Sequence, residues 1–193
     1  MEITKYDKKD VKILTKRSQS DVNQVLKTVT DIINNVKINK DKSVKEYTEK
    51  FDGVFVEDLK VTENEIKQAY ENLDENLINS LKSATENIKK FHTAQIPKEW
   101  SMEVKPGINA GQIIRPINSV GCYIPGGRAA YPSSILMTVI PAKIAGVKRI
   151  ICCTPPNKEG KILDAILVAA DIAGADEIYK VGGAQAIAAM AYG

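Results

Sequence analysis

The feature that most constrains the fold of this 193-residue chain is an alternation of apolar runs and helical patterns after residue 119. Short runs with the composition of buried strands lie at 119–124, 149–153 and 177–181. The segments at about 133–145 and 160–173 carry apolar residues at helical spacing, and another helix follows Gly182-Gly183. Strands and helices in this rhythm predict a parallel sheet with right-handed crossovers.

Each predicted strand ends in a break rich in glycine or proline. The breaks are Pro125-Gly126-Gly127, Thr154-Pro155-Pro156 and Gly182-Gly183. The carboxyl ends of parallel strands lie at one edge of a sheet, where ligands of open α/β sheets bind, so we expect the breaks to surround one crevice. Glycine between a strand and a helix lets the backbone approach a ligand closely, and a helix N-terminus offers N–H groups to an anion.

Two side chains fall at this expected crevice. Tyr123 lies at the end of the first strand, and Gln185 lies in the first turn after Gly182-Gly183. A tyrosine ring stacks on a flat heterocycle, and a glutamine amide both donates and accepts hydrogen bonds. Taken singly, Tyr123 is also consistent with a half-buried strand residue and Gln185 with a polar residue at a helix start. We expect the two to lie close together and neither to be a core residue.

The part before the sheet is mainly helical. Apolar residues at three- and four-residue spacing from Val22 to Val36 predict an amphipathic helix. Asp41 is expected to cap a second helix that ends at Asp52-Gly53. The sequence Thr62-Glu-Asn-Glu65 is a capping box before further helical stripes, which should end before Pro97. Two strands, at 100–104 and 111–115, are predicted on either side of Pro106-Gly107.

The composition does not favour nucleic-acid or membrane partners. The net charge is +3, which is too small to indicate nucleic-acid binding. No run approaches the roughly 18 apolar residues of a membrane span. The charged start MEITKYDKKDVK lacks the apolar core of a signal peptide, so we expect a cytoplasmic chain.

Three cysteines and one histidine offer little material for a metal site. Cys122, Cys152 and Cys153 fall in apolar strand-like runs, and their odd number favours reduced thiols in the core. Cys152 and Cys153 point to opposite faces of one strand and therefore cannot share a zinc ion. His92 lies near the end of a predicted helix, where we expect a structural role.

Two long stretches closely resemble the histidinol dehydrogenase family. They are RPINSVGCYIPGGRAAYPSSILMTVIPAKIAGV and TPPNKEGKILDAILVAADIAGADEIYKVGGAQAIAAMAYG, and the segments NVKINKDKSVKEYTEKFDG and NIKKFHTAQ fit the same family. The resemblance implies an α/β fold with a mainly helical section at 1–106. An incomplete Rossmann-like, NAD-binding parallel sheet of the aldehyde dehydrogenase type would follow at 107–193. It also implies an intertwined homodimer that oxidises L-histidinol through the aldehyde to L-histidine, using NAD and zinc.

Carried over to this sequence, the family's tyrosine and glutamine contacts to NAD match Tyr123 and Gln185. The family's zinc ligands and proton-transferring residues are expected beyond residue 193, so the resemblance implies no catalytic and no metal-binding residue in this chain. We therefore expect the N-terminal part of a histidinol dehydrogenase that is inactive alone. The alternatives are a self-standing nucleotide- or anion-binding α/β module, or a dimerisation fragment without catalysis.

Overall fold

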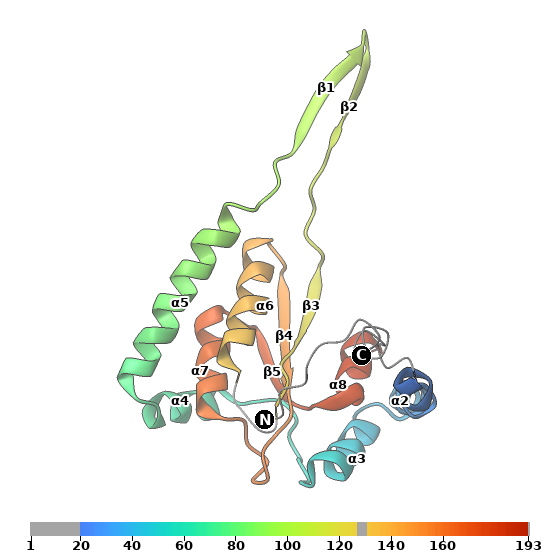
Figure 1. The fold of residues 1–193 in the computed structure, drawn as a ribbon, viewed down its shortest axis with the longest axis vertical. Coiled ribbons are helices and arrows are strands. Elements are labelled where there is room, and N and C mark those ends of the chain that lie inside the picture. The colour runs from blue at the N-terminus through green and yellow to red at the C-terminus, as the bar shows by residue number, and fades with distance from the viewer. Residues whose placement is uncertain (1–19, 127–130, 193) are drawn as a thin grey trace, which may run out of the picture.

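The computed structural model describes residues 20–126 and 131–192. At its centre lies a three-stranded parallel sheet (Figure 1). Its strands are β3 (Ser119–Tyr123), β4 (Arg149–Thr154) and β5 (Glu177–Lys180). They stand in the order β3-β4-β5, with Cys152 of β4 paired to Cys122 on one side and to Ile178 on the other. The predicted parallel sheet is confirmed.

Helices cover both faces of this sheet (Figure 1). One face is covered by α4 (Glu63–Asn72), α5 (Glu75–Thr93), α6 (Pro132–Ile144) and α7 (Asp164–Ala173). The other face is covered by α2 (Ser20–Asn39), α3 (Asp41–Asp52) and α8 (Gly183–Tyr192). The change of face comes after β5, because α6 and α7 connect the strands on the first face and α8 lies on the second.

Helices from the first part of the chain contribute residues to both core clusters. Ala69 and Leu81 lie in the cluster beneath α6 and α7, whereas Ile32, Val36 and Val44 lie in the cluster against α8. An α/β chain in which helices precede a parallel sheet is therefore confirmed. The division into sections at 1–106 and 107–193 stays a prediction.

The outer edge of β5 is covered by the extended segment before α4. Val61 N donates to Ile178 O at 2.8 Å, and Lys180 N donates to Leu59 O at 2.7 Å. The predicted capping box follows at once and is confirmed, since Glu65 N donates to Thr62 Oγ1 at 3.2 Å and Thr62 N donates to Glu65 Oε2 at 2.9 Å. The buried Lys180 ammonium donates to the other Glu65 oxygen at 3.0 Å, so the cap also ties α4 to the sheet.

The start of α3 differs from the prediction. Asp41 is not the N-cap: Lys40 occupies that position with φ 53, and Asp41 belongs to the first turn. The reason is that α2 ends at Asn39, so a single residue turns the corner between the two helices. The corner is closed by the buried Ser43, whose hydroxyl donates to Asn35 O at 3.0 Å. The predicted end at Gly53 is confirmed, with a left-handed φ of 73.

The two strands predicted around Pro106-Gly107 form and pair as a hairpin, but the second strand begins earlier than predicted. β1 (Trp100–Lys105) and β2 (Ile108–Gln112) pair in antiparallel fashion and project away from the body, exposed along their whole length (Figure 1). Lys105 pairs directly with Ile108, so β2 starts straight after the Pro106-Gly107 turn and not at residue 111. Residues 113–115 lie outside the strand.

The helix predicted from residue 160 begins later, as α7 at Asp164. The Asn157 side chain explains the delay, because its Oδ1 accepts the backbone N–H groups of Glu159 and Lys161 at 3.1 and 2.9 Å. Gly160 completes this tight turn with a φ of 73. The turn satisfies backbone groups that a helix would otherwise pair, so the helix cannot start there.

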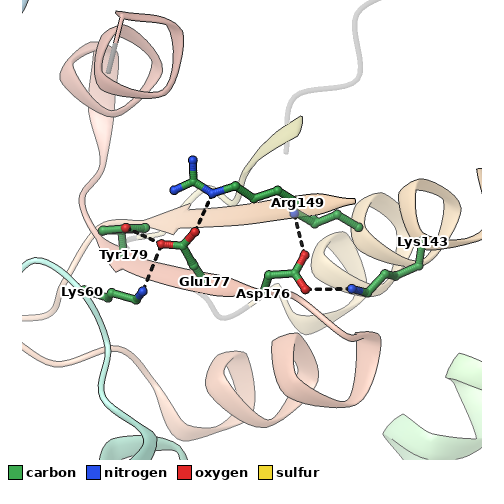
Figure 2. Close-up of polar contacts among 7 residues, drawn as sticks. Lys60, Lys143, Arg149, Asp176, Glu177 and Tyr179 are labelled. Atoms are coloured by element: carbon green, nitrogen blue, oxygen red, sulfur yellow. Dashed lines mark hydrogen bonds and ion pairs between the residues drawn. The ribbon is translucent and has the colours of Figure 1, made fainter. Parts of the chain in front are cut away.

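Charged side chains tie the amino-terminal edge of the sheet together (Figure 2). The Glu177 carboxylate, whose side chain is only 15% exposed, accepts hydrogen bonds from Arg149 Nε at 2.6 Å, Tyr179 OH at 2.7 Å and Lys60 Nζ at 3.0 Å. Hydrogen bonds from Arg149 and Tyr179 lower the pKa of Glu177 from 4.5 to about 2. Beside it, Asp176 accepts from Lys143 Nζ and from a backbone N–H of β4.

Replacing Glu177 by glutamine should destabilise the fold in a pH-dependent way. We expect Glu177→Gln to lower the free energy of unfolding at pH 7 by about 1–2 kcal/mol, since it weakens three hydrogen bonds to a carboxylate. The difference from the unchanged chain should be complete above pH 4.5 and shrink as the pH falls toward about 2, where Glu177 itself becomes protonated. Urea unfolding at several pH values measures this.

Glu86→Gln is the matched control, because the ion pair of Glu86 with Lys89 is exposed. It should change the free energy of unfolding by less than about 0.5 kcal/mol at any pH. Equal pH profiles for the Glu177 and Glu86 variants would contradict the role given to Glu177.

Candidate functional site

The three strand-end breaks lie side by side at the carboxyl edge of the sheet. Ile124 N donates to Cys153 O at 2.8 Å, which extends the pairing of β3 with β4 one residue beyond Tyr123. The break after Ile124 therefore lies next to the one that follows Thr154, and β5 brings Gly182 to the other side of β4. Gly127, the last residue of the first break, lies outside the described residues.

Pro155 occupies the space between two glycine turns. A Cβ added to Gly182 would lie 2.5 Å from Pro155 Cβ, and a Cβ added to Gly126 would lie 2.9 Å from Pro155 Cδ and closer still to Cγ. Since real Cβ atoms keep more than 3.0 Å from such neighbours, larger residues do not fit at either position without a shift. The missing side chains at these two glycines make room for Pro155, whereas the close approach of a ligand to the turns stays a prediction.

Tyr123 links β3 to the start of α8. Its side chain lies on the sheet face that α8 covers, and its hydroxyl accepts the backbone N–H of Gly183 at 3.2 Å. Gly183 is the first residue of α8 and has a left-handed φ of 64. Tyr123 thus takes up an N–H group at this helix start that the sequence suggested would be free for a ligand.

Gln185 is buried, and its amide has no partner. The residue is 1% exposed, and neither Nε2 nor Oε1 has a hydrogen-bond partner within the described part of the chain. The expectation that Gln185 is not a core residue is wrong, because the first turn of α8 packs its residues against the sheet beside Ala186. An unpaired buried amide costs about 1–3 kcal/mol, so its presence requires an explanation.

The structure brings Tyr123 and Gln185 together at Gly183. The Tyr123 hydroxyl contacts Gly183 N, and Gln185 Oε1 lies 2.5 Å from the point where a Gly183 Cβ would stand. A side chain at position 183 would thus collide with the Gln185 amide. Two residues that are far apart in sequence meet at one glycine, as the sequence predicts, whereas their role as NAD contacts stays a prediction.

One cavity lies at this edge of the sheet, and another lies on the face that α8 covers. The first, of about 120 Å³, is lined by Gly126, Pro155 and Lys161 among others. The second, of about 930 Å³, lies between α3, the segment before α4, and α8, and extends along the sheet face to Arg149 at the amino-terminal edge. Tyr123 and Gln185 line neither cavity. Because Gln185 is also buried, a ligand that pairs with its amide would require a local opening of the surrounding chain.

The cysteines are free, buried and divided between the two faces. Cys122 and Cys152 lie in the cluster beneath α6 and α7, and Cys153 lies in the cluster against α8. Burial raises the pKa of Cys153 to about 12, and the hydrogen bond with Cys122 raises the pKa of Cys152. The prediction of reduced core thiols on opposite faces is confirmed. The described residues contain no group of three or more histidine, cysteine or acidic side chains placed to hold a metal ion.

The strand order, the helices on both faces and the loops at the carboxyl edge define an incomplete Rossmann-like α/β domain. The sequence model of the histidinol dehydrogenase family matches residues 15–193. The chain therefore belongs to the histidinol dehydrogenase family.

Individual relatives agree with this assignment. The chain is 56% identical over its whole length to a histidinol dehydrogenase of Methanothermobacter thermautotrophicus, and 52% identical over 99% of its length to one of Methanococcus maripaludis. The crystal structure of histidinol dehydrogenase from Elizabethkingia anophelis superposes with a TM-score of 0.85 and 41% identity over 88% of this chain.

The chain is shorter than these proteins. It spans 45% of the length of the two archaeal relatives and 39% of the crystallised one. Within residues 20–126 and 131–192, none of the helices has the length and apolar character required to cross a membrane.

Replacing Gln185 by methionine tests whether its amide is unpaired in the folded chain. We expect Gln185→Met to raise the free energy of unfolding by about 1–2 kcal/mol, because methionine keeps the length of the side chain and leaves no polar atom unpaired. Guanidinium unfolding measures the change. Gln112→Met, on the exposed hairpin, is the control and should change it by less than about 0.5 kcal/mol. A destabilised Gln185→Met chain would indicate that the amide is already satisfied.

Proposed function

We propose that this chain is the N-terminal part of an NAD-dependent histidinol dehydrogenase and that its sheet edge forms one wall of the NAD site. The proposed reaction is the oxidation of L-histidinol through histidinaldehyde to L-histidine, for which NAD, when bound, would supply the hydride acceptor. The observation that carries the proposal is the buried, unpaired Gln185 amide beside Tyr123, in a chain of this family.

The residues present fit part of a nucleotide site. The Gln185 amide has both a donor and an acceptor that are unpaired within the described residues, which are the groups that pair with a heterocycle. Tyr123 offers an aromatic ring, and its hydroxyl holds the backbone at Gly183. Their tasks are to bind and orient the cofactor, whereas hydride transfer from an alcohol also requires a base.

The residues present do not fit a zinc site. Zinc in enzymes takes three or more nitrogen, sulfur or oxygen ligands, and no such group occurs among the described residues. No step of the reaction is therefore assigned to zinc within this chain. In the proposal, the zinc ligands and the proton-transferring residues of the whole enzyme lie outside residues 1–193, and the chain is inactive alone. The whole enzyme is proposed to be a cytoplasmic homodimer.

A nucleotide-binding module without catalysis is the second candidate, because the described part of the chain offers binding groups and no metal cluster. The two differ in reactivity. Adding L-histidinol and NAD to a protein of the length of the relatives should produce NADH if the first proposal holds. NAD binding without NADH formation in that longer protein would favour the module.

Binding of NAD to this chain is expected to be weak but measurable by calorimetric titration. In the proposal, the rest of the pocket belongs to the remainder of the whole enzyme, and the buried Gln185 amide becomes accessible only by a local opening. Gln185→Met and Tyr123→Leu should each weaken NAD binding by about 1–2 kcal/mol, roughly 5- to 30-fold.

Gln112→Met on the exposed hairpin should leave the affinity for NAD unchanged. The Gln185→Met variant is decisive, because it is expected to be more stable than the unchanged chain and yet to bind NAD less tightly. Equal affinity in the unchanged chain and both site variants would contradict the proposed site.

A further inference from the structure

Pro155 follows the middle strand of the sheet and contacts the turns that follow both outer strands. It lies directly after β4, which stands between β3 and β5. Its ring meets Gly126 after β3 and Gly182 after β5. Neither glycine has a positive φ, so the absence of a side chain at these positions is required by the close approach of Pro155 and not by the backbone conformation.

The two contacts differ in the proline atom that comes closest. The atoms nearest to a Cβ at Gly126 are Pro155 Cγ and Cδ, and the next is the Pro155 carbonyl oxygen at 3.5 Å. The atom nearest to a Cβ at Gly182 is Pro155 Cβ at 2.5 Å, and Cγ follows at 3.1 Å. Since the pyrrolidine ring is rigid and its φ is fixed, the ring acts as a spacer of constant width between the two turns.

The width between these turns controls the Tyr123 contact. Tyr123 ends β3, and Gly183 begins α8 just after β5; these two outer strands are two strand spacings apart, about 9–10 Å. The Tyr123 hydroxyl reaches across this distance and accepts from Gly183 N at 3.2 Å, the long end of the usual range. A change in spacing therefore alters this hydrogen bond and, with it, the position of Gln185 next to Gly183.

We propose that Pro155 is a positioning residue for the NAD site: it sets the distance between the glycine turns and so holds Tyr123 and Gln185 at Gly183. The identity of the ligand, NAD, rests on the proposed function. The contacts of Pro155 with the two glycines do not depend on it. Pro155 acts through Gly126 and Gly182.

The packing is tested by steric rescue in the 193-residue chain. Gly126→Ala and Gly182→Ala should each lower the melting temperature by about 2–10 °C, because each new Cβ collides with the ring. Adding Pro155→Ala removes Cγ and Cδ but keeps Cβ. It should therefore restore the Gly126→Ala chain to within about 2 °C of Pro155→Ala alone, and it should not restore Gly182→Ala.

The positioning role is tested by titration with NAD. Pro155→Ala should weaken NAD binding about fivefold or more, because the altered spacing should cost the site at least one contact with NAD. Pro156→Ala removes a proline from the same loop, but Pro156 is not among the nearest atoms to either glycine, so its affinity should match that of the unchanged chain. The Gly126→Ala/Pro155→Ala chain should regain stability and still bind NAD weakly, which a purely structural role for Pro155 would not produce.

Each outcome decides one part of the proposal. Rescue of both glycine variants, or of neither, would overturn the spacing role, and unchanged NAD affinity in Pro155→Ala would overturn the positioning role. If Pro155→Ala does not fold, Pro155→Ser, whose single γ atom can rotate away from Gly126, carries the same comparison. Absence of NAD binding in the unchanged chain would overturn the NAD site proposed at this sheet edge, and the melting temperatures would still decide whether Pro155 sets the spacing.

Discussion

Burial of a parallel sheet on both faces is the constraint on which the rest of this structure depends. Parallel strands cannot leave one face in water as antiparallel strands can, so helices must cover both. The crossovers through α6 and α7 cover only one face, and the second is closed by α8 together with α2 and α3 from the start of the chain. The early helices are therefore part of the sheet's core.

The two ends of the sheet satisfy their polar groups to different degrees. At the amino-terminal edge, Glu177 and Asp176 accept hydrogen bonds from cations on three separate segments, and the strands are held in place (Figure 2). At the carboxyl edge, the buried Gln185 amide has no partner among the described residues. Natural proteins depart from polar satisfaction mainly where function requires it, which supports a binding role for the second edge and a structural role for the first.

The sequence predicts elements whose cause is local. The strand and helix rhythm after residue 119, the capping box at Thr62 and the left-handed end at Gly53 were all predictable, because each depends on residues within one or two turns. The errors arise where distant or competing contacts decide. Asp41 is displaced as a cap by the one-residue corner after α2, and the Asn157 side chain delays α7.

At the candidate site, the meeting of Tyr123 and Gln185 followed from topology alone, since parallel strands place their carboxyl ends together. The burial of Gln185 could not be predicted in the same way, because it depends on how α8 rotates against the sheet. The spacing role of Pro155 was also missed. The sequence signal for this role is a proline after the middle of three strands, between two glycine turns. This signal can be interpreted only when the strand order is known.

The glycines at this edge show why a glycine-rich turn is weak support for a ligand. Gly126 and Gly182 are explained by the Pro155 ring, and Gly183 is explained by its left-handed φ and by the Gln185 amide in front of it. All three are required by the chain itself, with no ligand present. The argument for a cofactor therefore depends on the polar atoms these glycines bring together, because packing accounts for the glycines and leaves the unpaired Gln185 amide unexplained.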